Sequence, residues 1–187
     1  LATLLARGYA FKSESSGKYC LSLRMFELGS QVVNSCGVLS VTRPLLDDLF
    51  TAVGGTTIHL VLWENSSVTY IYKNDAPTML NSMQSHVGMH APMYCTGVGK
   101  SILALLPKEQ VKNIWEHSEI QRFTPTTITT LDGMYAELKI IREQGYAVDN
   151  EEHEFGIGCV AAAIRNCAGS PIAAVSISGL IRCIKDQ

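Results

Sequence analysis

Residues 159–178, with the sequence CVAAAIRNCAGSPIAAVSIS, indicate the fold class of this chain. Two runs of small and β-branched residues, 159–165 and 172–178, flank a short polar segment, which is the pattern of a β-hairpin. Residues 56–63 and 68–73 repeat this pattern with β-branched and aromatic residues around a polar turn. Because strands joined by a short turn pair in opposite directions, the two hairpins predict an antiparallel sheet.

Helical segments surround the two hairpins. Apolar residues spaced by three and four predict helices, and these cover residues 24–34, 42–53, 97–106, 107–117 and 131–144. Thr42 is expected to cap the second helix, with Pro44 in its first turn. Residues 79–85 and 146–148 are expected to add two strands. Strands and helices thus alternate irregularly, which favours an α+β fold, with an antiparallel sheet flanked by helices, over a doubly wound parallel fold.

Length and composition describe a globular protein. The chain has 187 residues, of which 47% are hydrophobic and 17% are charged, so a disordered, collagen-like or coiled-coil chain is excluded. This length allows one sizeable domain, or one domain plus a fragment. No apolar run approaches the roughly 18 residues that a membrane span needs. The net charge of −2 does not favour binding to a membrane surface, or binding of nucleic acid by this chain alone.

The cysteines indicate the cellular compartment, and the N-terminal residues indicate the domain organisation. None of the six cysteines forms a Cys-x-x-Cys pair, so reduced, mostly buried thiols in a cytoplasmic protein are expected. The beginning lacks the basic and apolar regions of a signal peptide. Instead, a helical pattern ends at Gly8, and a small hairpin follows over residues 9–12 and 19–23. A winged helix ends in this way, although other helix–hairpin pairs share the pattern.

Residues 97–101, GVGKS, are similar to part of a phosphate-binding loop. That motif needs a glycine five residues before its second glycine, and Tyr94 stands there, so the pattern fails. Thr96 and Gly97 still mark a helix start, where free N–H groups and the helix dipole attract an anion such as a small carboxylate. The alternative is a plain helix start with close backbone packing.

Three further groups carry possible chemistry. Asp149, His153 and Cys159 are similar to a Cys–His–Asp nucleophilic arrangement, but a solvated acidic turn beside a buried cysteine is the simpler interpretation. Together with His86 and His90 these groups could ligate zinc, although nearby glycine and proline argue against a helical His pair. In residues 176–178 the two serine hydroxyls share one face of a strand; they are expected to bind either the backbone or a ligand.

Several stretches together resemble one known family, the IclR family of bacterial transcription regulators. They are residues 17–29, 56–63, 68–73, 88–100, 123–129, 142–153, 156–162 and 175–179. Residues 17–29 are similar to the family's wing and linker helix, and residues 88–100 to the loop and helix start of its effector domain. The order and spacing cover nearly the whole chain, so the match is specific.

The resemblance implies an organisation and a function. Residues 1–23 would be the C-terminal remnant of a winged helix-turn-helix domain, 24–37 a linker helix, and 38–187 a GAF-like effector-binding domain truncated at its C-terminus. The implied protein is a cytoplasmic regulator, not an enzyme, without cofactor, metal or membrane partner. A small carboxylate or sugar acid would modulate its binding to operator DNA through the largely missing N-terminal domain. The implied assembly is a homodimer or homotetramer.

The resemblance also implies an effector site, carried over by motif. Its expected residues are Thr96, Gly97, Val98, Asp149, Cys159, Ser176, Ile177 and Ser178, with Met83 and Val87 on the apolar side of the pocket. Two other classes of function stay open. One is a thiol-dependent hydrolase that uses Cys159 as nucleophile. The other is a purely structural dimerisation module, which would bind no small molecule.

Overall fold

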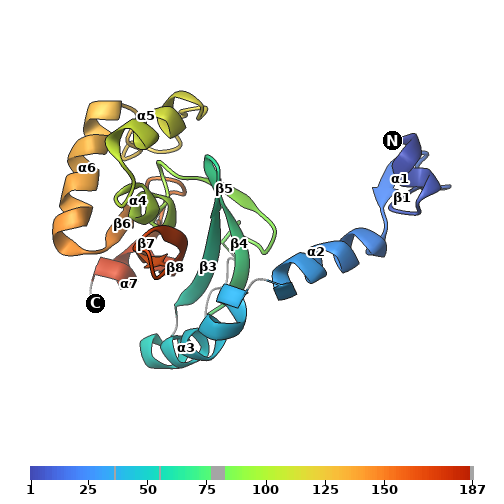
Figure 1. Ribbon diagram of the computed structural model, residues 1–187, viewed down its shortest axis with the longest axis horizontal. Coiled ribbons are helices and arrows are strands. Elements are labelled where there is room, and N and C mark those ends of the chain that lie inside the picture. Colours follow the sequence, from blue (N-terminus) through green and yellow to red (C-terminus); the bar gives the residue numbers. More distant parts are fainter. Residues whose placement is uncertain (36, 55, 77–82, 186–187) are drawn as a thin grey trace. The chain divides into compact units, whose positions relative to one another are not determined.

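The computed structural model describes residues 1–35, 37–54, 56–76 and 83–185. The chain divides into two compact units, Leu1–Arg43 and Pro44–Gln187. The first consists of short elements and helices, and the second contains the large sheet and its helices (Figure 1). Among the described helices, none combines the length and the apolar character that crossing a bilayer requires.

The first unit begins with the predicted helix and hairpin. Helix α1 (Ala2–Ala6) is followed by Gly8, whose φ of +70° suits a residue without a side chain. Strands β1 (Ala10–Lys12) and β2 (Tyr19–Leu21) pair antiparallel. This order confirms the predicted helix and hairpin.

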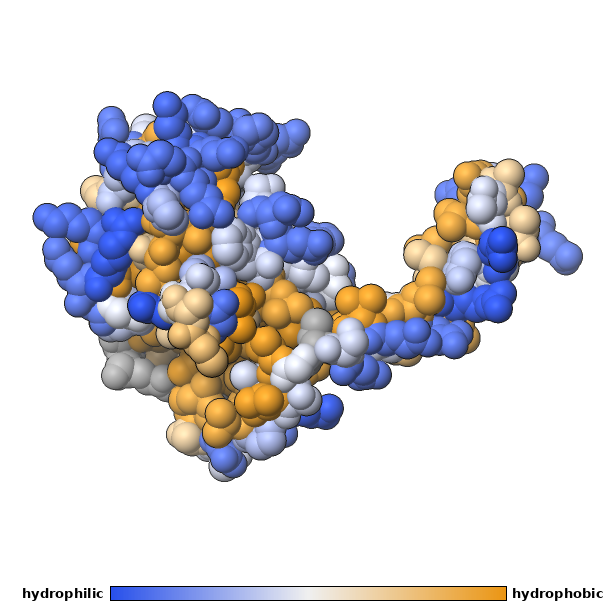
Figure 2. Space-filling model, viewed as in Figure 1, coloured by the Kyte–Doolittle hydropathy of each residue, from blue (hydrophilic) through white to orange (hydrophobic). Residues whose placement is uncertain are grey.

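Helix α2 (Leu23–Ser35) follows the hairpin and contains no buried residue. Leu23 is 85% exposed and Phe26 is 74% exposed, although both are large and apolar. Figure 2 shows hydrophobic residues gathered along α2. A helix that presents an apolar side to solvent is typical of an element that pairs with a partner.

The start of helix α3 (Gly37–Val53) differs from the prediction. Pro44 lies inside this helix rather than in its first turn. Thr42 does not cap it, because its hydroxyl donates to the carbonyl oxygen of Val38, four residues earlier in the same helix, at 2.7 Å. Proline removes one backbone hydrogen bond from a helix but does not always end it, and here the helix runs through it.

The second unit is built on a six-stranded antiparallel sheet in the order β5-β4-β3-β8-β7-β6. Its strands are β3 (Thr57–Glu64), β4 (Ser67–Asn74), β5 (His90–Pro92), β6 (Ala147–Asn150), β7 (Ile157–Arg165) and β8 (Pro171–Leu180). The two predicted hairpins, β3–β4 and β7–β8, join through β3 and β8 at the centre. The α+β class and the antiparallel sheet are thus confirmed.

One predicted strand differs in part. Residues 79–82 of the expected strand 79–85 lie outside the described residues, and residues 83–85 are not in a strand. The edge strand is instead β5, which pairs with β4 over three residues. It is short and contains Pro92, so its sequence lacks the alternation by which strands are recognised.

Helices cover both faces of the sheet. On one face, α4 (Gly97–Leu103) packs on β7 and β8, with α6 (Leu131–Gln144) outside it (Figure 1). Helix α5 (Lys108–Glu116) and the short α7 (Ile181–Lys185) complete the set. On the other face, Leu46 of α3 is buried and Asp47 accepts a hydrogen bond from Tyr72 at 2.6 Å.

The core lies between the sheet, α4 and α6. It includes Val61, Val98, Ile102, Met134 and Leu138, all at most 2% exposed. All seven residues of α4 are buried, which explains the small residues at its start. A Cβ atom on Gly99 would lie 2.3 Å from the Cα atom of Met93, so only glycine permits this approach.

Candidate functional site

A small, largely enclosed cavity lies between the start of α4, strands β3, β7 and β8, and the turn after β6. Its volume is about 50 Å³, which suits a few water molecules or a very small ligand, since one water needs about 10–15 Å³. The lining residues are His59, Tyr70, Met83, Gln84, Ser85, Met89, Thr96, Val98, Asp149, His153, Glu154, Ile157, Cys159, Ser176 and Ser178. Polar groups from four strands therefore meet an apolar wall.

His59, Ser176 and Ser178 form a buried polar row on the sheet. His59 of β3 pairs in register with Ser176 of β8. Its Nδ1 atom lies 3.4 Å from the Ser176 hydroxyl and 3.3 Å from the Ser178 hydroxyl. Its Nε2 atom shares a hydrogen bond of 2.9 Å with the Ser85 hydroxyl. The two serine hydroxyls thus contact a side chain rather than the backbone.

The imidazole of His59 is neutral at physiological pH. Burial, followed by the charge of Lys73, lowers its pKa to about 4. A neutral imidazole has one donor and one acceptor nitrogen, so it can orient the serine hydroxyls. The sequence prediction missed His59. The signal was present, because His59 is the polar residue within the apolar run at residues 58–62.

Asp149 of β6 lines the cavity and is buried. Its Oδ1 atom accepts the backbone N–H of Glu152 at 2.7 Å. Burial raises its pKa to about 7, with a smaller contribution from the charge of Glu152, while that backbone hydrogen bond and Lys100 act in the opposite direction. Near neutral pH this carboxyl group can therefore either donate or accept a hydrogen bond.

Cys159 pairs with Asp149 across β6 and β7 and is also buried. Burial, together with the charge of Asp149, raises the pKa of its thiol to about 12. The thiolate is the nucleophilic form of cysteine, so this environment opposes a nucleophilic role. His153 also lines the cavity, and its ring lies edge-on to Phe123 with centroids 4.9 Å apart.

The start of α4 is occupied by groups of the protein itself. The Thr96 hydroxyl accepts the N–H of Gly99 at 3.2 Å and donates to the carbonyl of Pro92 at 2.8 Å. A Cβ atom on Gly97 would lie 2.6 Å from the Sγ atom of Cys159. Gly97 therefore faces β7 rather than the cavity, and close backbone packing, the alternative from the sequence, explains this glycine.

The remaining expected residues divide into two groups. Val98 and Met83, both nearly fully buried, line the cavity. Val87 is 50% exposed and does not line the cavity. Ile177 points to the opposite face of β8, where it lines a separate apolar groove with Val175, because successive strand residues alternate between faces. Its side chain is therefore not part of the cavity.

A buried ion cluster holds the turn that carries His153 and Glu154. Lys100, fully buried, donates to Glu137 at 2.8 Å, to the Val148 carbonyl at 2.7 Å, and to the carboxylate of Glu152. Burial alone would lower the pKa of Lys100, but the nearby carboxylates raise it above its ordinary value, so the amine stays charged. Lys100, the lysine of the segment 97–101, therefore holds the protein's own carboxylates together rather than a phosphate.

Threonines anchor the same turn from the other side. The Thr124 hydroxyl donates to the Glu151 carbonyl at 2.6 Å, and the Thr127 hydroxyl donates to the Glu152 carbonyl at 2.6 Å. The threonine-rich segment 123–130 therefore holds the turn after β6, which forms one side of the cavity. From the sequence, this segment was predicted only as an extended connection.

The two histidines proposed as zinc ligands, His86 and His90, form hydrogen-bond contacts with other groups of the protein. His86 Nδ1 lies 3.2 Å from the Gln84 carbonyl oxygen, and His90 Nδ1 shares a hydrogen bond of 2.9 Å with Thr69. Over residues 1–35, 37–54, 56–76 and 83–185, no three histidine, cysteine or acidic side chains form a group that could hold a metal ion.

Comparison with known proteins defines the family. The family model described as "Bacterial transcriptional regulator IclR C-terminal" matches residues 30–187, which include the whole sheet and every residue of the cavity. The chain therefore belongs to the IclR family of bacterial transcriptional regulators.

Individual relatives agree with this assignment. The chain is 34% identical over 179 residues to the HTH-type transcriptional repressor AllR of Salmonella paratyphi A, covering 96% of this chain and 65% of that protein. It is 36% identical to the HTH-type transcriptional regulator KdgR of Escherichia coli, covering 95% of this chain and 67% of that protein. The crystal structure of Thermotoga maritima IclR superposes with a TM-score of 0.83 at 34% identity, covering 99% and 76% of the two chains. The chain thus spans about two thirds of the length of the first two relatives.

Proposed function

We propose that this chain is the sensing part of a DNA-binding transcriptional regulator. A small carboxylate or sugar acid bound in the cavity would change the affinity of the whole protein for its operator DNA. The cavity itself carries this proposal, because it joins two hydroxyls, a neutral imidazole and a titratable carboxyl group to an apolar wall. Such a combination suits a small polar ligand. The relatives named as transcriptional repressors and regulators support the regulatory role.

The cavity favours a short ligand with more than one oxygen function. Its volume of about 50 Å³ excludes long chains. Ser176, Ser178 and His59 offer neutral hydrogen bonds, and Asp149 in its protonated form can donate to a carboxylate. In its charged form Asp149 would instead accept from a hydroxyl group of the ligand and repel a carboxylate. A small oxo or hydroxy acid fits these groups better than a plain fatty acid.

The proposal includes partners for the rest of the protein. Residues 1–23 are proposed to end a winged helix-turn-helix domain, residues 24–37 to form the linker helix, and residues 38–187 to form the effector-binding domain. The exposed apolar residues of α2 support pairing with a second copy of the chain. Operator DNA would bind through the winged-helix domain, and the bacterial cytoplasm is the compartment that this function implies.

Two observations oppose the hydrolase alternative. The raised pKa of the Cys159 thiol disfavours the thiolate. In addition, the Sγ atom is packed so closely on Gly97 that a Cβ atom there would lie 2.6 Å away. A nucleophile needs access to its substrate, so a sensing role fits this cysteine better.

A thermal-shift screen against small carboxylates and sugar acids tests the proposal. A ligand at about 100 times its dissociation constant adds about 2.7 kcal/mol to the free energy of unfolding, which is easily measured. At the same ligand concentration the stabilisation should fall to about half or less in the Ser178→Ala variant, because its binding is at least about tenfold weaker. It should persist in Ser170→Ala, which lies in the exposed β7–β8 turn. No shift with any compound would favour a structural dimerisation module. Ester turnover abolished by alkylation of Cys159 would favour the hydrolase.

A further inference from the structure

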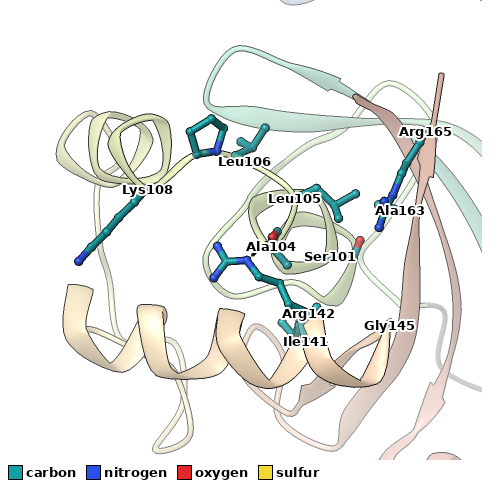
Figure 3. Close-up of a pocket in the computed structure, with 11 residues that line it drawn as sticks. Ser101, Ala104, Leu105, Leu106, Lys108, Ile141, Arg142, Gly145, Ala163 and Arg165 are labelled. Atoms are coloured by element: carbon teal, nitrogen blue, oxygen red, sulfur yellow. Dashed lines mark hydrogen bonds between the residues drawn. The ribbon is translucent and has the colours of Figure 1, made fainter. Parts of the chain in front are cut away.

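A second pocket lies at the opposite end of α4 from the proposed sensing cavity. It is bounded by the end of α4, the start of α5, the last turn of α6 and the end of β7 (Figure 3). Its volume of about 670 Å³ falls within the range of about 300–1,000 Å³ typical of small-molecule sites. The lining residues are Ser101, Ala104, Leu105, Leu106, Pro107, Lys108, Ile141, Arg142, Gly145, Ala163 and Arg165.

The charges around this pocket all have one sign. Lys108, Arg142 and Arg165 come from three different elements, and no acidic residue lines the pocket. None of the three forms a salt bridge within the part of the chain that the structure describes. Figure 3 shows Lys108 and Arg165 on either side of Arg142. A pocket lined by cations and no anions concentrates the positive potential and attracts anions.

Arg142 is held in place at the centre of this group. Its Nε atom donates to the carbonyl oxygen of Ala104 at the end of α4, at 2.6 Å. This bond uses one donor of the guanidinium and fixes the plane of the group. The two terminal nitrogens donate to no other described residue, so they remain available to a ligand. A guanidinium can bind a carboxylate or a phosphate through two parallel hydrogen bonds.

The floor of the pocket is apolar. Leu105, Leu106, Ile141 and Ala163 form it, and Leu106 and Ile141 belong to the hydrophobic core. This floor provides a rigid surface for the carbon atoms of a ligand, while the cations at the sides provide the charge. Three cations from separate elements suit a ligand with more than one anionic group better than one isolated carboxylate.

We propose that this second pocket binds a small organic anion with two or more charged groups, a di- or tricarboxylate or a phosphate ester. The site is separate from the sensing cavity, and the inference does not rest on the proposed function. Arg142 and Arg165 would bind the anionic groups directly, and Lys108 would add charge at the rim. A second ligand site on the same domain would let a regulator respond to two metabolites.

Titrations of the isotope-labelled chain at low ionic strength test this site. Citrate and inorganic pyrophosphate serve as probes for the carboxylate and phosphate chemistries, and amide NMR shifts report the location. We expect saturable shifts at residues 104–106, 108 and 163–165, with little change at His59 and Ser176. The double variant Lys108→Gln/Arg165→Gln should bind at least about tenfold more weakly, because it removes two of the three cations that line the pocket.

Lys139→Gln is the matched control. Lys139 lies on the exposed surface of α6, pairs with Glu143 at 3.9 Å and does not line the pocket. Its substitution removes one positive charge, half of what the double variant removes, without touching the site. Equal weakening by Lys139→Gln would show diffuse charge attraction and overturn the proposal. Absence of saturable shifts with both probes would also overturn it. Binding of only one probe would support the site and identify the ligand chemistry.

Discussion

Asp149 and His59 show at the scale of single residues how burial sets protonation in the cavity between α4 and the sheet. Burial raises the pKa of Asp149 to about 7 and lowers that of His59 to about 4. Desolvation favours the neutral form of both groups, which explains the opposite directions. At neutral pH the imidazole is therefore neutral, while the carboxyl group is divided between its two forms. The charge of the cavity then depends on Asp149.

The first prediction concerns the pH dependence of stability. Because the pKa of Asp149 is raised from 3.8 to about 7, the folded chain binds this proton more tightly than the unfolded chain. The resulting stability is complete below about pH 4 and is lost as the pH rises through about 7. The neutral amide of Asp149→Asn has no such dependence. Its free energy of unfolding, relative to the wild type, should rise over this range by on the order of 1–4 kcal/mol.

Urea unfolding followed by tryptophan fluorescence at several pH values measures this difference. Trp63 and Trp115 both lie in the second unit, so the signal reports on the domain that contains Asp149. The contribution of His59 cancels, because it is present in both proteins. Asp48→Asn makes the same substitution at an exposed position and serves as the control. A constant difference for Asp149→Asn would contradict the prediction.

The second prediction concerns the ligand that the thermal screen identifies. Ser178→Ala and Asp149→Ala should each weaken its binding at least about tenfold, because a buried hydrogen bond to a charged group contributes about 1.5–3 kcal/mol. Calorimetric titration gives the two dissociation constants, and Ser170→Ala is the control. Unchanged affinity in both variants would place the ligand outside the cavity.

The secondary-structure elements show which parts of the fold and site the sequence could predict. Hairpins β3–β4 and β7–β8 were predictable because residue type and spacing are local signals. The start of α3 was not predictable in this way. Proline usually marks the first turn of a helix, but here the helix begins at Gly37 and continues through Pro44. The contact between His59 and the serines depends on the pairing of β3 with β8, which are distant in sequence. The burial of Lys100 likewise depends on Glu137 and Glu152 from two other segments.

The third prediction concerns the packing of α4 on β7. A Cβ atom on Gly97 would lie 2.6 Å from Cys159 Sγ and 3.3 Å from Ala161 Cβ. Gly97→Ala should therefore lower the free energy of unfolding by about 1–3 kcal/mol, as overpacking does. Combining it with Cys159→Ala removes the closer of the two contacts. The double variant should then lose less stability than the sum of the single variants, and simple additivity in urea unfolding would argue against this contact.

The fourth prediction concerns the ion cluster that joins α4, α6 and the turn after β6. Lys100→Met leaves Glu137 and Glu152 without their cation and should cost about 3–5 kcal/mol, as breaking a buried pair does. The control is Lys112→Met, which removes an exposed pair with Glu116 and should change stability little. Hydrogen exchange at residues 150–154 should also become faster in Lys100→Met. If the unfolding free energies of Lys100→Met and Lys112→Met lay within about 1 kcal/mol of each other, the stabilising role of the cluster would be contradicted.

At the scale of the whole molecule, the two units differ in how much apolar surface they bury. The second unit has a continuous core between the sheet, α4 and α6. In the first unit, α2 has no buried residue, and its large apolar residues are exposed. Fully burying one such side chain contributes about 1.5–3 kcal/mol. A partner surface on α2 therefore offers a substantial free energy of association, and the proposed homo-oligomer would use it.

The last prediction tests α2 as the surface that pairs two copies of the chain. Sedimentation equilibrium at high micromolar concentrations should show self-association of the wild type. Phe26→Glu places a charge among the exposed apolar residues of α2 and should raise the dissociation constant at least about tenfold, since burying an unpaired charge costs more than 1.4 kcal/mol. Phe26 is 74% exposed, so this change should not unfold the chain. Gln31→Glu adds the same charge on the polar side of α2 and should leave association nearly unchanged. A monomeric wild type would contradict the predicted self-association. Equal effects of the two variants would place the contact between copies elsewhere.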